Sequence, residues 1–221
     1  QNPAYRASGS VSGLPLLRQW QTLPLFPRFR MRLLVASCSL HPASRSRWLA
    51  AHAYDYLRAT GEEVSWYDLR DADLPPCDGA AAYGDPRVAA AAEVLGPADG
   101  ILLASPVYNY DVNAAAKNWI ELTGAAGWQG KVGGLLLAAG GAGSYLSGLP
   151  LANSLMTDFR CVRLPRFVYA SGDVPRHPGG GAPEPGLAGR IANRGEDLRL
   201  FTRNLAEYRA RERQRRERQT H

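Results

Sequence analysis

Cysteine is scarce in this sequence, and its spacing excludes two classes of site. The only three cysteines, Cys38, Cys77 and Cys161, lie far apart and are odd in number. There is no CxxC pair and no cysteine–histidine cluster, and the four histidines are scattered. The sequence therefore indicates neither a zinc site nor a disulfide framework. Free thiols fit a reducing compartment, and we expect a cytoplasmic protein.

Several familiar motifs are also missing. No apolar run approaches the roughly 18 residues that a membrane span needs, so we expect no membrane association. There is no GxGxxG and no GxxxxGK[ST], and neither a Ser/His/Asp arrangement nor a pair of carboxylates stands out. Acid–base chemistry by side chains is therefore not indicated.

Lysine is almost absent, because only Lys117 and Lys131 among the 26 basic residues are lysine. The net charge of +6 comes from the two ends of the chain. Residues 1–30 carry +4 and residues 190–221 carry +5, whereas residues 31–189 carry −3. A mildly acidic central part argues against nucleic-acid binding by the whole protein.

The first 30 residues lack hydrophobic periodicity and contain four prolines. They could be a flexible arm, the remnant of a targeting peptide, or sequence that precedes a true start at Met31. We favour the last interpretation, and we expect an irregular extension over residues 1–30. The fold itself is predicted to begin at Met31.

From Met31 onward, short apolar runs alternate with segments of helical periodicity. The strands are predicted at residues 32–37, 63–69, 99–105, 130–140 and 160–171, with Pro165 indicating an edge position or a bulge in the last. The helices are predicted at residues 44–61, 85–98, 113–124, 144–159 (interrupted by Pro150) and 187–221 (with a frayed basic end). Residues 171–186 are predicted to form a loop.

Five strands that alternate with five helices predict an α/β fold, a doubly wound parallel sheet with helices on both faces. Right-handed crossovers leave two common strand orders, and in both of them ligands bind beyond the carboxyl ends of the strands. The loops after the first, third and fourth strands are therefore the candidate site.

The first loop, Ser37–Ala50, places three hydroxyls and a guanidinium just before a helix. Ser39, Ser44, Arg45 and Ser46 could bind a terminal phosphate, because a helix N-terminus offers free N–H groups and partial positive charge. The alternative is that Ser44 or Ser46 only caps the helix. We interpret His41 as a surface residue of the loop.

The loops after the third and fourth strands are unusual in composition. In the stretch SPVYNYDVNAAAKNWIEL, a flat heteroaromatic ring could lie against the residues Pro106, Val107, Tyr108, Asn109 and Tyr110. In AAGGAGS, Gly140, Gly141 and Gly143 permit close approach of a ligand to the backbone. For the loop after the third strand, the alternative is that the tyrosines only cover the sheet edge or lie in a protein interface. For the loop after the fourth strand, the alternative is a flexible glycine turn without a ligand.

The same stretch resembles the signature of the NADPH-dependent FMN reductase family, roughly [TS]-P-x-Y-N-x-x-x-P-x-x-L-K-N-x-I-D. Matching positions are Pro106, Tyr108, Asn109, Lys117, Asn118 and Ile120. SLHPASRS resembles the family's phosphate loop and AAGGAGS its third loop. Asn113, Ala116 and Glu121 stand where the pattern has proline, leucine and aspartate.

This resemblance implies a flavodoxin-like fold with a five-stranded parallel sheet over residues 31–210, followed by a basic tail at 211–221. It implies bound FMN, reduction by NADPH or NADH, and an electron acceptor such as flavin, quinone, an azo compound or a metal oxyanion. Members form dimers or tetramers, and the helix with Trp119 and Glu121 resembles their dimer surface. Lys117 and Asn118 are expected to fix the loop to the helix.

Two other functions stay open. The protein could be a flavin-binding electron carrier, although carriers of this fold are usually strongly acidic. It could also be a non-enzymatic interaction module, which the Arg-rich tail suggests. No clear clamp for the 2′-phosphate of NADPH is visible, with Arg87 and Arg160 as the only candidates.

Overall fold

The structure, a computed structural model, describes residues 30–177 and 180–219. Apart from Arg30, the irregular extension predicted over residues 1–30 lies outside the described residues. Among the residues described, no helix is long and apolar enough to cross a membrane.

A parallel sheet forms the centre of the molecule. Its order is β2 (Glu63–Asp68), β1 (Arg32–Ser37), β3 (Gly100–Tyr108), β5 (Val132–Ala139) and β6 (Val162–Arg163). A further segment, β7 (Val168–Ser171), pairs with β5 beyond β6, so the outer strand is interrupted around Pro165. The predicted doubly wound, flavodoxin-like sheet is confirmed, with the first strand lying between the second and the third.

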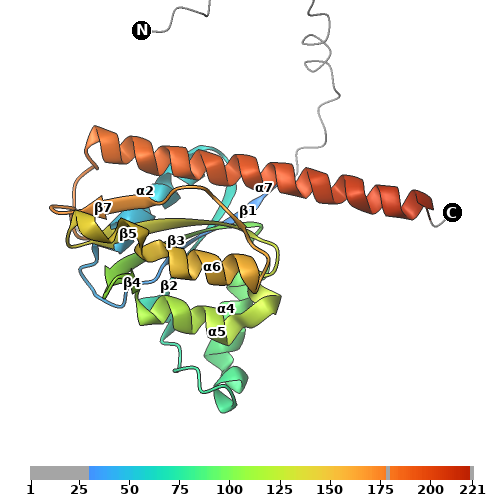
Figure 1. Cartoon of the computed structure of the whole chain (residues 1–221), viewed down its shortest axis with the longest axis horizontal. Coiled ribbons are helices and arrows are strands. Elements are labelled where there is room, and N and C mark those ends of the chain that lie inside the picture. The colour runs from blue at the N-terminus through green and yellow to red at the C-terminus, as the bar shows by residue number, and fades with distance from the viewer. Residues whose placement is uncertain (1–29, 178–179, 220–221) are drawn as a thin grey trace, which may run out of the picture.

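Helices cover both faces of this sheet (Figure 1). One face carries α2 (Arg45–Ala59) and α7 (Pro185–Gln219), and the other carries α4 (Pro86–Leu95), α5 (Ala114–Trp128) and α6 (Leu149–Thr157). Side chains of β1 alternate between the two cores, as the period of a strand requires. Leu33 and Val35 pack with Trp48 of α2, whereas Leu34 packs with Trp119 of α5.

Helix starts follow the predicted caps. The hydroxyl of Ser44 accepts from the backbone N–H of Arg47, and the carboxylate of Asp85 accepts from that of Arg87. Pro150 lies in the first turn of α6, which begins at Leu149, so the helix predicted over residues 144–159 is interrupted just before Pro150. The preceding residues form a separate 3₁₀ helix, η2 (Ala142–Gly148).

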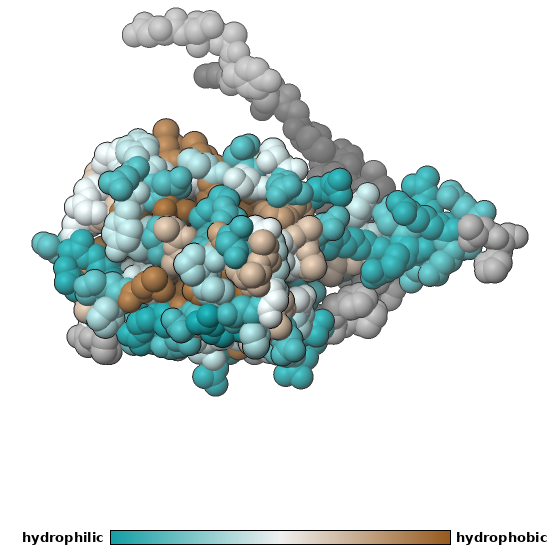
Figure 2. Space-filling model, turned by 90° about the horizontal axis from the view of Figure 1, so that it is seen from below, coloured by the Kyte–Doolittle hydropathy of each residue, from teal (hydrophilic) through white to brown (hydrophobic). Residues whose placement is uncertain are grey.

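Two predicted helix ends were wrong. The helix predicted to stop at Gly124 continues to Trp128 through a kink at Gly124, whose φ is 52°. The last helix does not fray at its basic end, since α7 is continuous to Gln219. Its buried residues end at Thr202, and its last described turns extend beyond the sheet as a hydrophilic arm (Figures 1 and 2).

Candidate functional site

The loops after β1, β3 and β5 meet around a cavity of about 280 Å³. Eight residues that the sequence predicted as ligand-binding line it, namely Ser39, Ser44, Arg45, Ser46, Pro106, Val107, Tyr108 and Gly140. The sequence analysis did not assign five further lining residues to the site, namely His41, Ala43, Ala138, Ala139 and Arg176. Asn109, Tyr110, Gly141 and Gly143 do not line this cavity.

The three serines of the first loop are buried and bonded locally. Ser44 caps α2, and its hydroxyl also lies 3.0 Å from that of Ser46. The hydroxyl of Ser39 accepts from the backbone N–H of His41 at 3.2 Å. The capping interpretation therefore holds for Ser44, while all three serines line the cavity beside the N-terminus of α2.

The charge in the cavity is one-sided. Two arginines line it, Arg45 and Arg176, and no carboxylate does within the described part of the chain. The Nε of Arg45 is buried and has no hydrogen-bond partner among the residues described. Burial, and then the nearby Arg47, lower the pKa of His177, which follows the cavity residue Arg176 but does not itself line the cavity. Hydroxyls, guanidinium groups and helix N–H groups form a donor set that fits a phosphate dianion.

The second loop is a tight hairpin. β3 continues past Pro106 and pairs with β4 (Asp111–Val112), which leaves Asn109 and Tyr110 as a two-residue turn. Their φ values are 51° and 66°, as a type I′ turn requires, and asparagine is a favoured residue there. The Tyr110 hydroxyl donates to the carbonyl of Gly143 at 3.0 Å and so joins the second loop to the third.

Asn113 joins the second loop to the first. Its backbone N–H donates to the Ser105 hydroxyl at 3.2 Å, and that hydroxyl donates to the Asn113 Oδ1 at 2.9 Å. The Asn113 Nδ2 donates to the carbonyl of Cys38 at 2.7 Å. All of these groups are buried. Asn113 was expected to start α5 and to depart from the family pattern, but its role between the loops was not predicted, because its partners are distant in sequence.

The third loop is held from β7. The Tyr169 hydroxyl bonds to the carbonyl of Gly141 and lies 2.7 Å from the Ser144 hydroxyl. A side chain at Gly140 would meet nothing within 4 Å, so the backbone there is open to a ligand. No sequence signal pointed to Tyr169.

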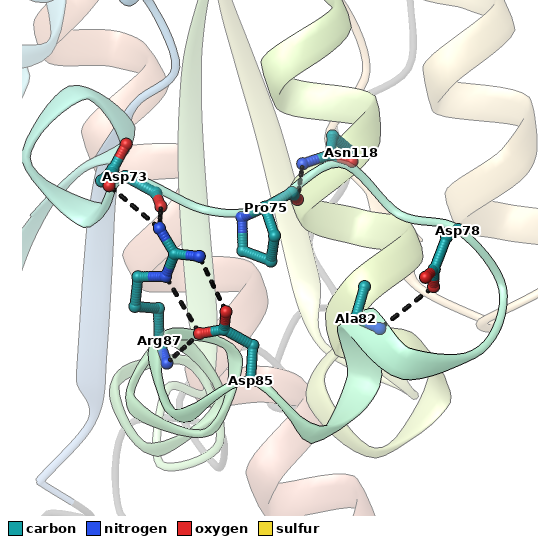
Figure 3. A network of polar contacts seen from close by, with 7 residues as sticks. All are labelled: Asp73, Pro75, Asp78, Ala82, Asp85, Arg87 and Asn118. Atoms are coloured by element: carbon teal, nitrogen blue, oxygen red, sulfur yellow. Dashed lines mark hydrogen bonds and ion pairs between the residues drawn. The ribbon is translucent and has the colours of Figure 1, made fainter.

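Residues around α5 have structural contacts. Asn118 accepts from the N–H of Cys77 at 2.7 Å and donates to the carbonyl of Pro75 at 2.9 Å, so it fixes the segment before α4 (Figure 3). Lys117 pairs with Glu121 on the surface. Trp119 is fully buried against Tyr67 and Trp128, so it belongs to the core, and a dimer surface on the exposed side of this helix stays a prediction.

Neither candidate for a 2′-phosphate clamp lies at the cavity. Figure 3 shows the guanidinium of Arg87 between Asp73 and Asp85. It donates to a carboxylate oxygen of Asp73 at 2.9 Å and to one of Asp85 at 2.7 Å. Arg160 precedes β6, at the opposite end of the strands from the three loops. Arg87 is therefore a structural residue.

Comparisons with known proteins identify the family of this chain. The sequence model of the NADPH-dependent FMN reductase family matches residues 31–174. An FMN-dependent NADH:quinone oxidoreductase of Shewanella loihica is 31% identical over 109 residues, which are 43% of this chain and 55% of that protein. The match thus spans about half the length of this relative.

Solved structures support the fold. An apo NADH:FMN oxidoreductase superposes with a TM-score of 0.61 at 16% identity, over 77% of this chain and 89% of that one. A flavodoxin from the domain Archaea superposes with a TM-score of 0.54 at 14% identity, over 78% of this chain and 99% of that one. At such identities the likeness shows a shared flavodoxin-like fold.

Proposed function

This chain belongs to the NADPH-dependent FMN reductase family, and we propose that it is an FMN-dependent NAD(P)H oxidoreductase whose flavin lies in the three-loop cavity. FMN supplies the redox chemistry, because its ring accepts a hydride from NAD(P)H and passes electrons on to an acceptor. We propose a small-molecule acceptor such as free flavin, quinone, an azo compound or a metal oxyanion, in a reducing compartment such as the cytoplasm.

The observation that carries this proposal is the donor set beside the N-terminus of α2. Ser39, Ser44 and Ser46 offer hydroxyls, and Arg45 offers a buried Nε that has no partner among the described residues. Their roles are to bind and orient the phosphate of FMN. Charge-assisted bonds at a helix N-terminus suit this terminal dianion, and no carboxylate of the described residues opposes it at the cavity.

The residues for the ring come from the other two loops. Pro106, Val107 and Tyr108 follow the buried part of β3 and would form one wall of the slot, while Gly140 opens the facing wall. Asn109 and Tyr110 would fix the shape of the turn, and Gly141 and Gly143 the course of the facing loop. These residues would hold the flavin ring so that the nicotinamide of NAD(P)H can stack on it, which brings the hydride donor and acceptor together. No side chain has to transfer a proton.

We also propose a homo-oligomer, either a dimer or a tetramer. Large apolar side chains are exposed near the mouth of the cavity, on the hairpin and on η2, namely Tyr108, Tyr110, Tyr145 and Leu146. Their clustering suits burial against a second copy. Light scattering coupled to gel filtration measures the mass.

The test of the activity is steady-state oxidation of NADPH and NADH by protein that was reconstituted with FMN. We expect turnover with a quinone or azo acceptor that disappears when FMN is left out. Protein that binds FMN but oxidises neither nucleotide would favour the electron-carrier alternative. Colourless protein that retains RNA would favour the interaction module.

A further inference from the structure

The chain after β7 turns back over the start of α2. The backbone N–H of His177 donates to the carbonyl of Ser44 at 3.2 Å, and the two residues form an antiparallel bridge. Val174 is buried, and the indole N–H of Trp48 donates to the carbonyl of Gly181 at 3.2 Å. These contacts anchor the backbone on both sides of Arg176 against the start of α2, the helix that follows the first loop.

This anchoring places Arg176 at the wall of the three-loop cavity, where the residues of the first loop also lie. Arg176 makes no ion pair or side-chain hydrogen bond with the described residues, and the same holds for Arg45. The nearby carboxylate of Asp68 is already paired with Arg47 at 2.8 Å. Two guanidinium groups therefore face one cavity without a counter-charge from the described residues.

The negative charge of the FMN phosphate matches the two positive charges of Arg45 and Arg176. The phosphate monoester of FMN carries about −1.5 to −2 at pH 7, by analogy with other phosphate monoesters. Arg45 can neutralise about one of these charges. A second cation is needed for the rest, and Arg176 is the other arginine that lines the cavity.

We infer that Arg176 is a second phosphate-binding arginine, which acts with Arg45 on the 5′-phosphate of FMN. This inference rests on the proposed function. It adds a residue to that site from outside residues 31–174, the part that matches the family model. The segment that carries Arg176 was predicted only as a loop, and its contact with Ser44 explains why a residue so late in the chain reaches the first loop.

The test compares the dissociation constants of FMN and riboflavin, measured by quenching of flavin fluorescence. Riboflavin has the same ring but lacks the phosphate. For Arg176→Ala we expect FMN binding to weaken about tenfold or more, as for loss of a charge-assisted hydrogen bond, and riboflavin binding to stay unchanged. Arg176→Lys should lie between this variant and the wild type.

Arg190→Ala is the matched control, because Arg190 is an exposed arginine of the following helix and does not line the cavity. It should bind both flavins as the wild type does. Equal weakening of FMN and riboflavin by Arg176→Ala, or no weakening of either, would overturn the inference while leaving the proposed function in place. If the wild type binds neither flavin, the proposed function fails and the inference fails with it.

Discussion

Asn113 holds the second loop against the first through hydrogen bonds. It uses its backbone N–H, its Oδ1 and its Nδ2, and the last of these satisfies the buried carbonyl of Cys38. Proline, the residue of the family pattern at this position, has no N–H and no side-chain donor. The other members must therefore hold these loops by other contacts.

We predict that Asn113→Pro and Asn113→Ala each lower the free energy of unfolding by about 1–3 kcal/mol, because the carbonyl of Cys38 then stays buried without a donor. Urea denaturation measures this change. Asn153→Ala, at an exposed position of α6, is the control and should change the value by less than about 0.5 kcal/mol. An Asn113→Pro variant as stable as the wild type would show that the contacts of Asn113 contribute nothing.

Unlike Asn113, whose polar groups are hydrogen-bonded, Arg163 has a buried guanidinium without a partner among the described residues. Its Nε and both Nη atoms are buried, and none is hydrogen-bonded to a described residue. Burial lowers the pKa of Arg163 to about 10. Arg194 is also a buried arginine, but it has partners. It donates to the carbonyl of Pro165 at 2.7 Å and pairs with Asp197 at 2.9 Å.

These two arginines make a matched test of stability. Arg163→Met should raise the free energy of unfolding by about 1 kcal/mol, because an apolar side chain of similar length avoids the desolvation of an unpaired charge. Arg194→Met should lower it by about 1–3 kcal/mol, because the carbonyl of Pro165 loses its donor. Equal destabilisation by both substitutions, measured by urea denaturation, would contradict this account.

At the residue scale, the sequence predicted those parts of the site that lie within one loop. Ser44, Arg45 and Ser46 line the cavity as expected, because helix capping and phosphate binding use neighbouring residues, and their contact with a phosphate stays a prediction. Arg176 and Tyr169 were missed because each reaches the site from a segment far away in the chain. Periodicity and turn chemistry carry no information about such contacts.

At the scale of elements, the connection between α3 (Leu69–Ala72) and α4 is held by charge. Arg87 bridges Asp73 and Asp85, and Asp85 also caps α4 (Figure 3). Hydrogen bonds from the side chain and the backbone of Arg87 lower the pKa of Asp85 to about 2. The folded-state value lies below the ordinary value of 3.8, so this carboxylate stabilises the fold above about pH 4 and loses the effect as the pH falls towards 2.

Asp85→Asn isolates that charge, because asparagine keeps a side-chain oxygen for the helix cap. We predict that the variant has a lower Tm than the wild type at pH 7 and that the difference shrinks between pH 4 and pH 2. Circular dichroism at several pH values follows both proteins. A difference that stays constant down to pH 2 would mean that the ion pair does not contribute.

Helices were predictable where a capping residue such as Ser44 or Asp85 precedes a segment of helical periodicity. Strands were predictable where a short apolar run is bounded by polar residues, as in β1. The misses have local causes. Gly124 adopts a positive φ inside α5 without ending it. The arginine–glutamate mixture of the tail predicted a solvated helix end with i,i+4 ion pairs, and pairs such as Arg211 with Glu207 and Arg215 with Glu212 lie along α7, which continues to Gln219 where a frayed end was expected.

At the scale of the whole molecule, alternation of strands and helices predicted the layers but not the strand order. Both doubly wound orders obey the same handedness rule. The resemblance of SPVYNYDVNAAAKNWIEL to a flavodoxin-like family selected one of them, and the observed order agrees. In either order the carboxyl ends of the strands share one edge, which is why three loops of unusual composition were expected to meet.

The most direct test of the central claim is the visible spectrum of the protein after addition of FMN and removal of the excess, followed by NADPH and then NADH under nitrogen. We expect flavin absorbance that stays with the protein and bleaches when a reduced nicotinamide nucleotide is added. A protein that retains no flavin, or whose bound flavin stays oxidised with both nucleotides, would contradict the central claim.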